Sequence, residues 1–274
     1  MLTFPPEGQP RTRFSEPKKT MNKSVVTLLI VCGVFAVTAR QASAQGGTWA
    51  DRGYINVGWG VESGSSAMTD TKTGTIYEES ATITSSSTFS SGSLFDVGVG
   101  VRVIRNLTVG VSYHQEQNDT EGTLTGAIPS PVFFNRPRQL NDTVPGLERK
   151  ESAAHIQIGW VLPFGEKFDV LVYGGPSFFR LTQDAVSNVT IGEQGGSFTT
   201  VVAQPTITGR SKSVTGFNAG ADATYIVWTN DSIRLGVGGF LRFTQASTDV
   251  EMLTTSQPTD VGGMQFGFGG RIRF

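Results

Sequence analysis

The fold is decided most clearly by the C-terminal stretch, Met264-Gln265-Phe266-Gly267-Phe268-Gly269-Gly270-Arg271-Ile272-Arg273-Phe274. Its apolar members alternate with small or basic residues, and they are Phe266, Phe268, Ile272 and Phe274. Alternation with a period of two is typical of a β-strand whose two faces meet different surroundings. We therefore predict a strand over residues 264–274.

Seven further segments alternate in the same way, and no segment of helical period interrupts them. In each, one face is rich in Val, Leu, Ile and aromatic residues, while the other carries Gly and scattered charges; the alternation in 168–181 is the least regular. The segments are 52–62, 94–103, 107–116, 153–162, 168–181, 214–227 and 233–243. Together with 264–274 they predict an all-β chain of eight antiparallel strands.

The connections between these segments alternate strictly between long and short. The short ones are 104–106, 164–167 and 228–231, and the long polar ones are 63–93, 117–151, 182–213 and 244–263. This order predicts an up-and-down arrangement with short turns at one end and long loops at the other. Within 182–213, two β-prone runs flank Gly192-Glu193-Gln194-Gly195-Gly196 and predict a hairpin.

The glycine-rich face predicts a narrow closed interior, because a solvated face would carry many more Lys, Glu and Thr residues. An eight-stranded barrel is just wide enough for its interior side chains, and buried arginines need carboxylate partners. The charged or titratable residues expected in the lumen are Glu62, Asp96, Arg102, His114, Asp222, Arg234, Arg242 and Arg271. We expect them to form an ion-paired plug.

The opposite face is apolar, and aromatic residues lie near several strand ends, at Trp59, Tyr113, Trp160, Tyr225 and Phe274. An apolar exterior with aromatic girdles is typical of a transmembrane β-barrel. The order of the connections then predicts three periplasmic turns and four surface loops.

The last strand resembles the C-terminal signature of bacterial outer-membrane β-barrel proteins. Residues 50–274 as a whole resemble, by pattern, the small eight-stranded barrels of the OmpA transmembrane domain and OmpX type, and the stretch from Tyr173 to Phe178 is similar to mid-barrel strands of that class. The resemblance implies a Gram-negative outer membrane, with its lipid and lipopolysaccharide as surroundings. It also implies that the barrel-assembly machinery recognises Phe266, Phe268, Ile272 and Phe274.

Composition and the N-terminal residues agree with export. The chain has 274 residues, 22 basic and 23 acidic side chains and one cysteine, Cys32, so it lacks the basic balance of a nucleic-acid binder. Residues 21–44 combine a basic start, an apolar run too short to span a bilayer, and Ala42-Ser43-Ala44, which predicts a signal peptide cleaved after Ala44. We expect residues 1–20 to be an upstream extension before the true start at Met21, and 45–274 to be the barrel domain.

For function, the sequence predicts a structural or surface-interaction protein, with loops 117–151 and 182–213 as the surface for a ligand. We expect no enzyme activity, no cofactor and no metal. A narrow pore for small solutes is the alternative, because interior glycines leave room for water. A lipid-modifying enzyme comes third, since Asp96 is expected opposite His114, near Ser112 and His155; a metal site from Asp96 and the two histidines is the weakest reading.

Overall fold

The computed structural model describes residues 49–90, 92–194, 198, 200–251 and 254–274. In this part of the chain every regular element is a strand, and there are eleven strands. No helix among these residues is long and apolar enough to cross a membrane. The predicted segments 1–20 and 21–44, with the cleavage site after Ala44, lie outside the described residues.

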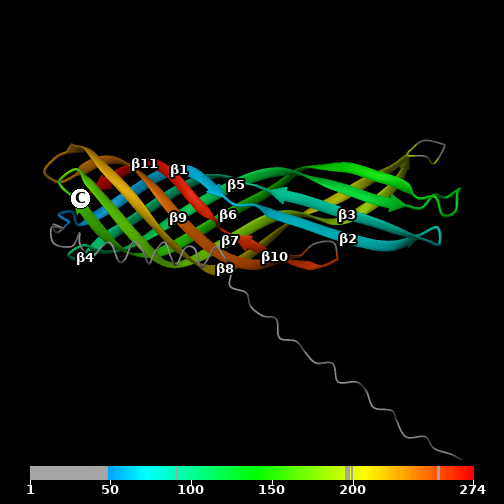
Figure 1. Cartoon of the computed structure of the whole chain (residues 1–274), viewed down its shortest axis with the longest axis horizontal. Helices are drawn as coiled ribbons and strands as arrows, with labels where there is room; N and C mark the ends of the chain where they lie inside the picture. Colours follow the sequence, from blue (N-terminus) through cyan, green and yellow to red (C-terminus); the bar gives the residue numbers. More distant parts are fainter. Residues whose placement is uncertain (1–48, 91, 195–197, 199, 252–253) are drawn as a thin grey trace, which may run out of the picture. The chain divides into compact units, whose positions relative to one another are not determined.

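Eight of the strands close into a ring. In chain order they are β1 (Gly53–Ser63), β4 (Gly92–Ile104), β5 (Leu107–Ile128), β6 (Arg138–Phe164), β7 (Phe168–Gln194), β8 (Thr200–Thr229), β9 (Arg234–Glu251) and β11 (Met264–Arg273). Each pairs antiparallel with its neighbours, and β11 closes the ring by pairing with β1 (Figure 1). The predicted eight-stranded antiparallel barrel is therefore confirmed.

The long connections were predicted to be loops, and this prediction was wrong, because they are largely strands. β2 (Ser66–Ile76) and β3 (Glu79–Phe89) form a hairpin that pairs with the distal part of β5, and β10 (Ser256–Val261) pairs with the distal part of β9. β7 and β8 stay paired as far as Gln194 and Thr200, which confirms the predicted hairpin. Figure 1 shows β2 and β3 beside these distal strand halves, which together we call the extension.

The barrel and the extension share strands but have opposite polarity. Along β5 the same parity faces inward throughout, yet the inward residues change from polar, as at His114, to apolar, as at Leu124 and Ile128. The outward residues change in the opposite sense, from exposed Val111 to exposed Thr123. Period two persists, so the strand continues while the polarity of its two faces reverses.

The interior holds three apolar clusters. The cluster at the short-turn end comprises Trp49, Tyr54, Val161, Leu171 and Tyr173. A second, at the junction with the extension, comprises Met68, Ala153, Phe179, Leu181, Ala246, Val250 and Val261. The third fills the extension and comprises Ala81, Ile83, Phe89, Leu124, Ile128, Leu140, Val144, Leu147, Val186 and Ala203. Charged layers also lie inside the barrel, and the Arg273 guanidinium packs over the Tyr54 ring of the first cluster.

Candidate functional site

The exterior of the barrel is a belt of exposed apolar side chains. Phe268 is 75% exposed and Trp59 is 60% exposed, although both lie in the middle of paired strands. Other exposed members are Val61, Phe95, Val99, Val101, Val109, Val111, Tyr113, Ile156, Ile158, Trp160, Leu162, Val172, Phe178, Phe217, Tyr225, Val237, Leu241 and Phe266. Such a continuous apolar exterior calls for an apolar partner or medium.

One charged layer inside the barrel is centred on Arg242. Its guanidinium donates to Asp96 Oδ2 at 2.7 Å, to Gln265 Oε1 at 2.6 Å and to Ser112 Oγ at 3.1 Å. These groups come from β9, β4, β11 and β5, so one arginine joins four strands across the lumen. Because Arg242 is buried, this pairing offsets part of the cost of placing its charge away from water.

A second charged layer lies nearer the short turns. Arg271 binds Asp222 through two parallel hydrogen bonds, with Nε 2.9 Å from Oδ1 and Nη2 2.7 Å from Oδ2. Arg273, which the sequence prediction left out, reaches Asn56 at 2.7 Å and Asp169 at 3.3 Å. Arg273 has the same parity as Arg271, and this parity could have predicted that Arg273 also faces the lumen.

Two of the predicted lumen residues lie at the rim and not in these layers. Arg102 is partly buried and donates to the backbone carbonyl of Trp49. Arg234 pairs with Asp51 and donates to the Glu166 carbonyl at 3.0 Å. Both therefore fasten the segment before β1 to the short-turn end, where the Trp49 side chain is buried.

The interior glycines make room for large side chains. A Cβ on Gly100 would clash with the Tyr54 ring, and a Cβ on Gly238 would lie 3.0 Å from Arg271 Nε. Glycine therefore sits where a ring or a guanidinium crosses the narrow lumen. The space that the pore alternative assigned to water is, at these two positions, occupied by protein.

A third layer, which we call the histidine layer, contains His114 and His155 and differs from the Ser112–His114–Asp96 arrangement that the enzyme alternative needs. Asp96 does face His114 across β4 and β5, as expected, but its carboxylate binds Arg242. His114 Nδ1 lies 2.7 Å from His155 Nε2, and the Ser112 hydroxyl accepts from Gln157 at 3.0 Å. No hydrogen bond between Ser112 and His114 is present in the described structure, so the Ser–His–Asp set is not assembled as a catalytic relay.

The same layer contains carboxylates and an arginine that the sequence prediction missed. Glu62, which was predicted, accepts from Gln265, while Glu151 on β6 accepts from Arg149 at 3.3 Å. Glu151 is four residues before His155 and shares its inward parity. The predicted strand began at 153, so this inward position was not recognised.

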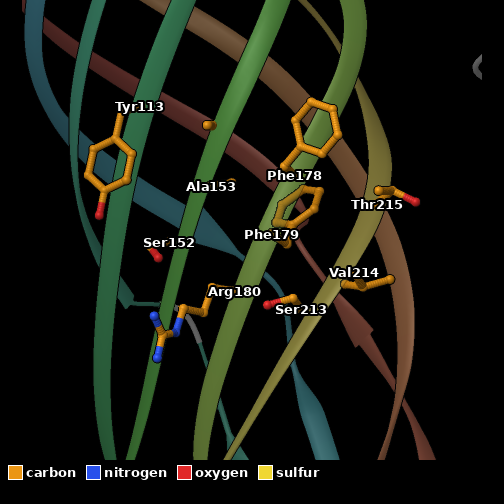
Figure 2. Close-up of a pocket in the computed structure, with 10 residues that line it drawn as sticks. Tyr113, Ser152, Ala153, Phe178, Phe179, Arg180, Ser213, Val214 and Thr215 are labelled. Carbon is orange, nitrogen blue, oxygen red and sulfur yellow. The ribbon is translucent and has the colours of Figure 1, made fainter.

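A shallow groove crosses the outer wall where the apolar belt meets the extension. It has a volume of about 600 Å³ and spans β5, β6, β7 and β8. Figure 2 shows Tyr113 and Phe178 on either side of the small residues Ser152 and Ala153, with Arg180 nearby. Its walls are mostly apolar, and Arg180 supplies its one guanidinium.

The outer end of the extension, which we call the tip, consists of Tyr77, Glu78, residues 129–137 and Phe198. It exposes several large apolar side chains, among them Phe134, which is 80% exposed; the others are Tyr77, Val132, Phe133 and Phe198. They come from three different hairpin turns. Apolar exposure on this scale, outside the belt, marks a candidate interaction surface.

Arg138 joins the turns of the tip. It donates to Glu193 Oε1 at 2.8 Å, to the Phe198 carbonyl at 2.9 Å and to the Pro129 carbonyl at 2.7 Å. The hydrogen bond from Arg138 lowers the pKa of the Glu193 carboxyl, and the same bond raises the pKa of Arg138. Asn135 adds a backbone hydrogen bond to Glu79 of β3 at 3.0 Å, so the exposed rings stand on a cross-linked base.

Comparison with known proteins gives no matching family model and no matching curated protein. Two similar solved structures are Neisserial surface protein A (NspA), with 13% identity and a TM-score of 0.36, and the outer membrane protein OprG from Pseudomonas aeruginosa, with 10% identity and a TM-score of 0.40. The first match covers 81% of this chain and 97% of NspA, and the second covers 83% of this chain and 98% of OprG. At these values nothing about the role of this chain follows from either likeness.

Proposed function

We propose that this chain is an integral barrel of a bacterial outer membrane that raises a rigid β-structured extension above the lipid and presents its apolar tip to a partner. The observation that carries the proposal is the reversal of polarity along continuous strands. Outward residues are apolar in the barrel and polar in the extension, whereas inward residues change the other way. A water-soluble barrel would keep one polarity along its whole length.

The dimensions of the belt fit an outer membrane. On β6 the outward apolar residues run from Ala154 to Phe164. At a rise of ~3.3 Å per residue and a tilt of ~40°, such a stretch is roughly 25–28 Å tall, close to the apolar band of outer-membrane barrels. The strands close on themselves, so no backbone edge of the barrel would face lipid.

The interior favours a closed plug over an open pore. Arg242, Arg271 and Arg273 form ion-paired layers in the lumen, and apolar clusters fill further parts of the interior. The pore alternative predicts stable conductance steps in a planar bilayer. The plug predicts a silent trace with the same preparation, and large wild-type steps would contradict it.

The first test concerns location and folding. Expressed protein should fractionate with outer membranes, resist a carbonate wash and migrate faster on gels when unboiled. Recovery in the soluble periplasm would refute the membrane proposal, whatever the tip binds.

The second test concerns the tip. Cells displaying the protein should be retained on octyl-agarose, and the variant Phe133→Ser/Phe134→Ser should lose this retention because it removes the two most exposed rings of the tip. The matched control is Thr123→Ser/Thr125→Ser, at exposed outward positions on β5 below the tip. Equal retention of both variants would refute the apolar tip as the contact surface.

A further inference from the structure

The histidine layer brings together three possible metal ligands. One ligand atom from each of Glu62, His114 and Glu151 lies within 4.8 Å of the other two, and all three residues are buried. They come from β1, β5 and β6. This set is independent of the tip and of the apolar belt.

The hydrogen bonds around Gln265 determine which nitrogen of His114 is unprotonated. Arg242 can only donate, so Gln265 Oε1 accepts from it at 2.6 Å and Gln265 Nε2 is the donor end. That amide nitrogen donates to Glu62 and lies 3.3 Å from His114 Nε2. His114 Nε2 therefore accepts from this amide and carries no proton, so a metal ion would take the place of that hydrogen bond.

The remaining ring nitrogens agree with this assignment. With Nε2 accepting, the neutral ring of His114 has its proton on Nδ1, which donates to His155 Nε2 at 2.7 Å. His155 Nδ1 then donates to Ser177 Oγ at 2.7 Å, and Asn218 donates to the same oxygen at 3.0 Å. A ligating histidine commonly has its second nitrogen held in this way, because the bond fixes its tautomer and orientation.

Glu151 points an unsatisfied oxygen at the same place. Its Oε2 accepts from Arg149 and from the Gly262 amide, each at 3.3 Å. Its Oε1 is buried without a hydrogen-bond partner in the described structure and lies 3.8 Å from His114 Nε2. A buried carboxylate oxygen without a donor is costly, and a proton or a metal ion bound there would remove that cost.

Charge and access both favour a cation. Glu116 joins Glu62 in lining an adjacent cavity of about 210 Å³, and Arg149 is the arginine on its wall. The cavity reaches Ser65 and Ser90, which are exposed, so it offers an entry path from the extension side. Arg242 is already held by Asp96, so the carboxylates outnumber the cations available to them.

We propose that Glu62, His114 and Glu151 bind one divalent transition-metal ion, with Zn²⁺ as the probe. One imidazole nitrogen and two carboxylate oxygens are a donor set that zinc accepts at ~2.0–2.2 Å, which places ligand atoms roughly 3.3 Å apart. From the present spacing the two glutamate side chains would move inward, and the Gln265 amide would give up its hydrogen bonds to Glu62 and His114. Water completes the coordination from the cavity.

The test uses the untagged full chain, folded in detergent and freed of metal with EDTA. Equilibrium dialysis against Zn²⁺ should give saturable binding of one ion per chain, and Zn²⁺ should raise the Tm. In Glu151→Gln the affinity should fall at least about ten-fold, a loss known from changes around metal ligands. His114→Gln should lose binding similarly.

The order of the Tm values of Glu151→Gln and the wild type, measured without and with Zn²⁺, distinguishes metal ligation by Glu151 from a structural role. In EDTA, Glu151→Gln should melt above the wild type, because it removes a buried carboxylate whose Oε1 is unpartnered. In Zn²⁺ the order should reverse. Glu148→Gln, an exposed glutamate on the same strand, is the matched control and should bind like the wild type.

Heat-modifiable migration on gels reports whether each variant has folded. No saturable Zn²⁺ binding by the folded wild type would overturn the proposal, and so would equal binding by folded Glu151→Gln. Neither result bears on the tip or on membrane insertion.

Discussion

At the scale of single residues, a substitution of Arg271 tests how much the ion pairs in the lumen contribute to the free energy of unfolding. The two parallel hydrogen bonds from Arg271 to Asp222 are buried, so Arg271→Ala would leave that carboxylate with Arg273 as its nearest cation, 3.9 Å away. We expect the free energy of unfolding to fall by about 3 kcal/mol, the lower end of the range for a broken buried pair. Denaturant titration of the barrel in lipid vesicles measures it.

The control for Arg271 is an exposed arginine. Arg210 lies 3.9 Å from Glu251 with much of both side chains exposed, so Arg210→Ala should change stability by less than about 1 kcal/mol. The double variant Arg271→Ala/Asp222→Ala should recover part of the loss, since it also removes the stranded carboxylate. Equal changes in stability for Arg271→Ala and Arg210→Ala would show that the buried pair stabilises the protein no more than the exposed pair does.

Glu193 makes the tip sensitive to acid. Its pKa is lowered by the hydrogen bond from Arg138, so this stabilisation is present above the unfolded pKa of about 4.3 and is lost as the pH falls through the lower folded value. Amides of residues 129–137 in Glu193→Gln should therefore exchange hydrogen faster than wild type at pH 7. At pH 3 or below the difference in exchange rate between the variant and the wild type should become smaller. Mass spectrometry measures both, and an identical difference at the two pH values would exclude the carboxylate as the cause.

At the scale of elements, the sequence predicted the strand segments whose outward face is apolar and missed the rest. Val109 and Val111 alternate with Gly110 and Ser112, which is a strong period-two signal. β2 and β3 are built mainly from Thr and Ser, so they lack that signal and were predicted as loop. In β5 the outward residues beyond Tyr113 are polar, and the strand was therefore predicted to end at residue 116.

The candidate site was predictable only in part for a related reason. Alternation identifies which residues face inward, and Asp96 opposite His114 followed from one short turn. It does not tell which side chain crosses the lumen, because Arg242 reaches Asp96 from β9, more than one hundred residues along the chain. Closure of the ring brings these two residues together, and alternation within adjacent strands could not predict this contact.

The reversal of polarity can be tested on one face of one strand. Val111 and Thr123 both point outward on β5 and both are exposed. Val111→Lys should reduce the free energy of folding into vesicles by roughly 2–4 kcal/mol, the range for lysine near the middle of a bilayer. Thr123→Lys should have almost no effect because water surrounds it. Equal costs would mean that both positions meet the same medium.

At the scale of the whole molecule, the two ends should differ in access from outside the cell. Each end exposes phenylalanines suitable for chymotrypsin: Phe133 and Phe134 at the tip, and Phe164 at the turn between β6 and β7. If the extension faces outward, protease added to intact cells should cut at the tip and leave Phe164 untouched. The extension should yield few other fragments, because β5–β8 stay paired almost to their turns. Permeabilising the outer membrane should then expose the Phe164 turn. Cleavage at Phe164 alone in intact cells would mean that the barrel is inserted the other way, with the tip and the carboxylate-lined cavity opening toward the periplasm.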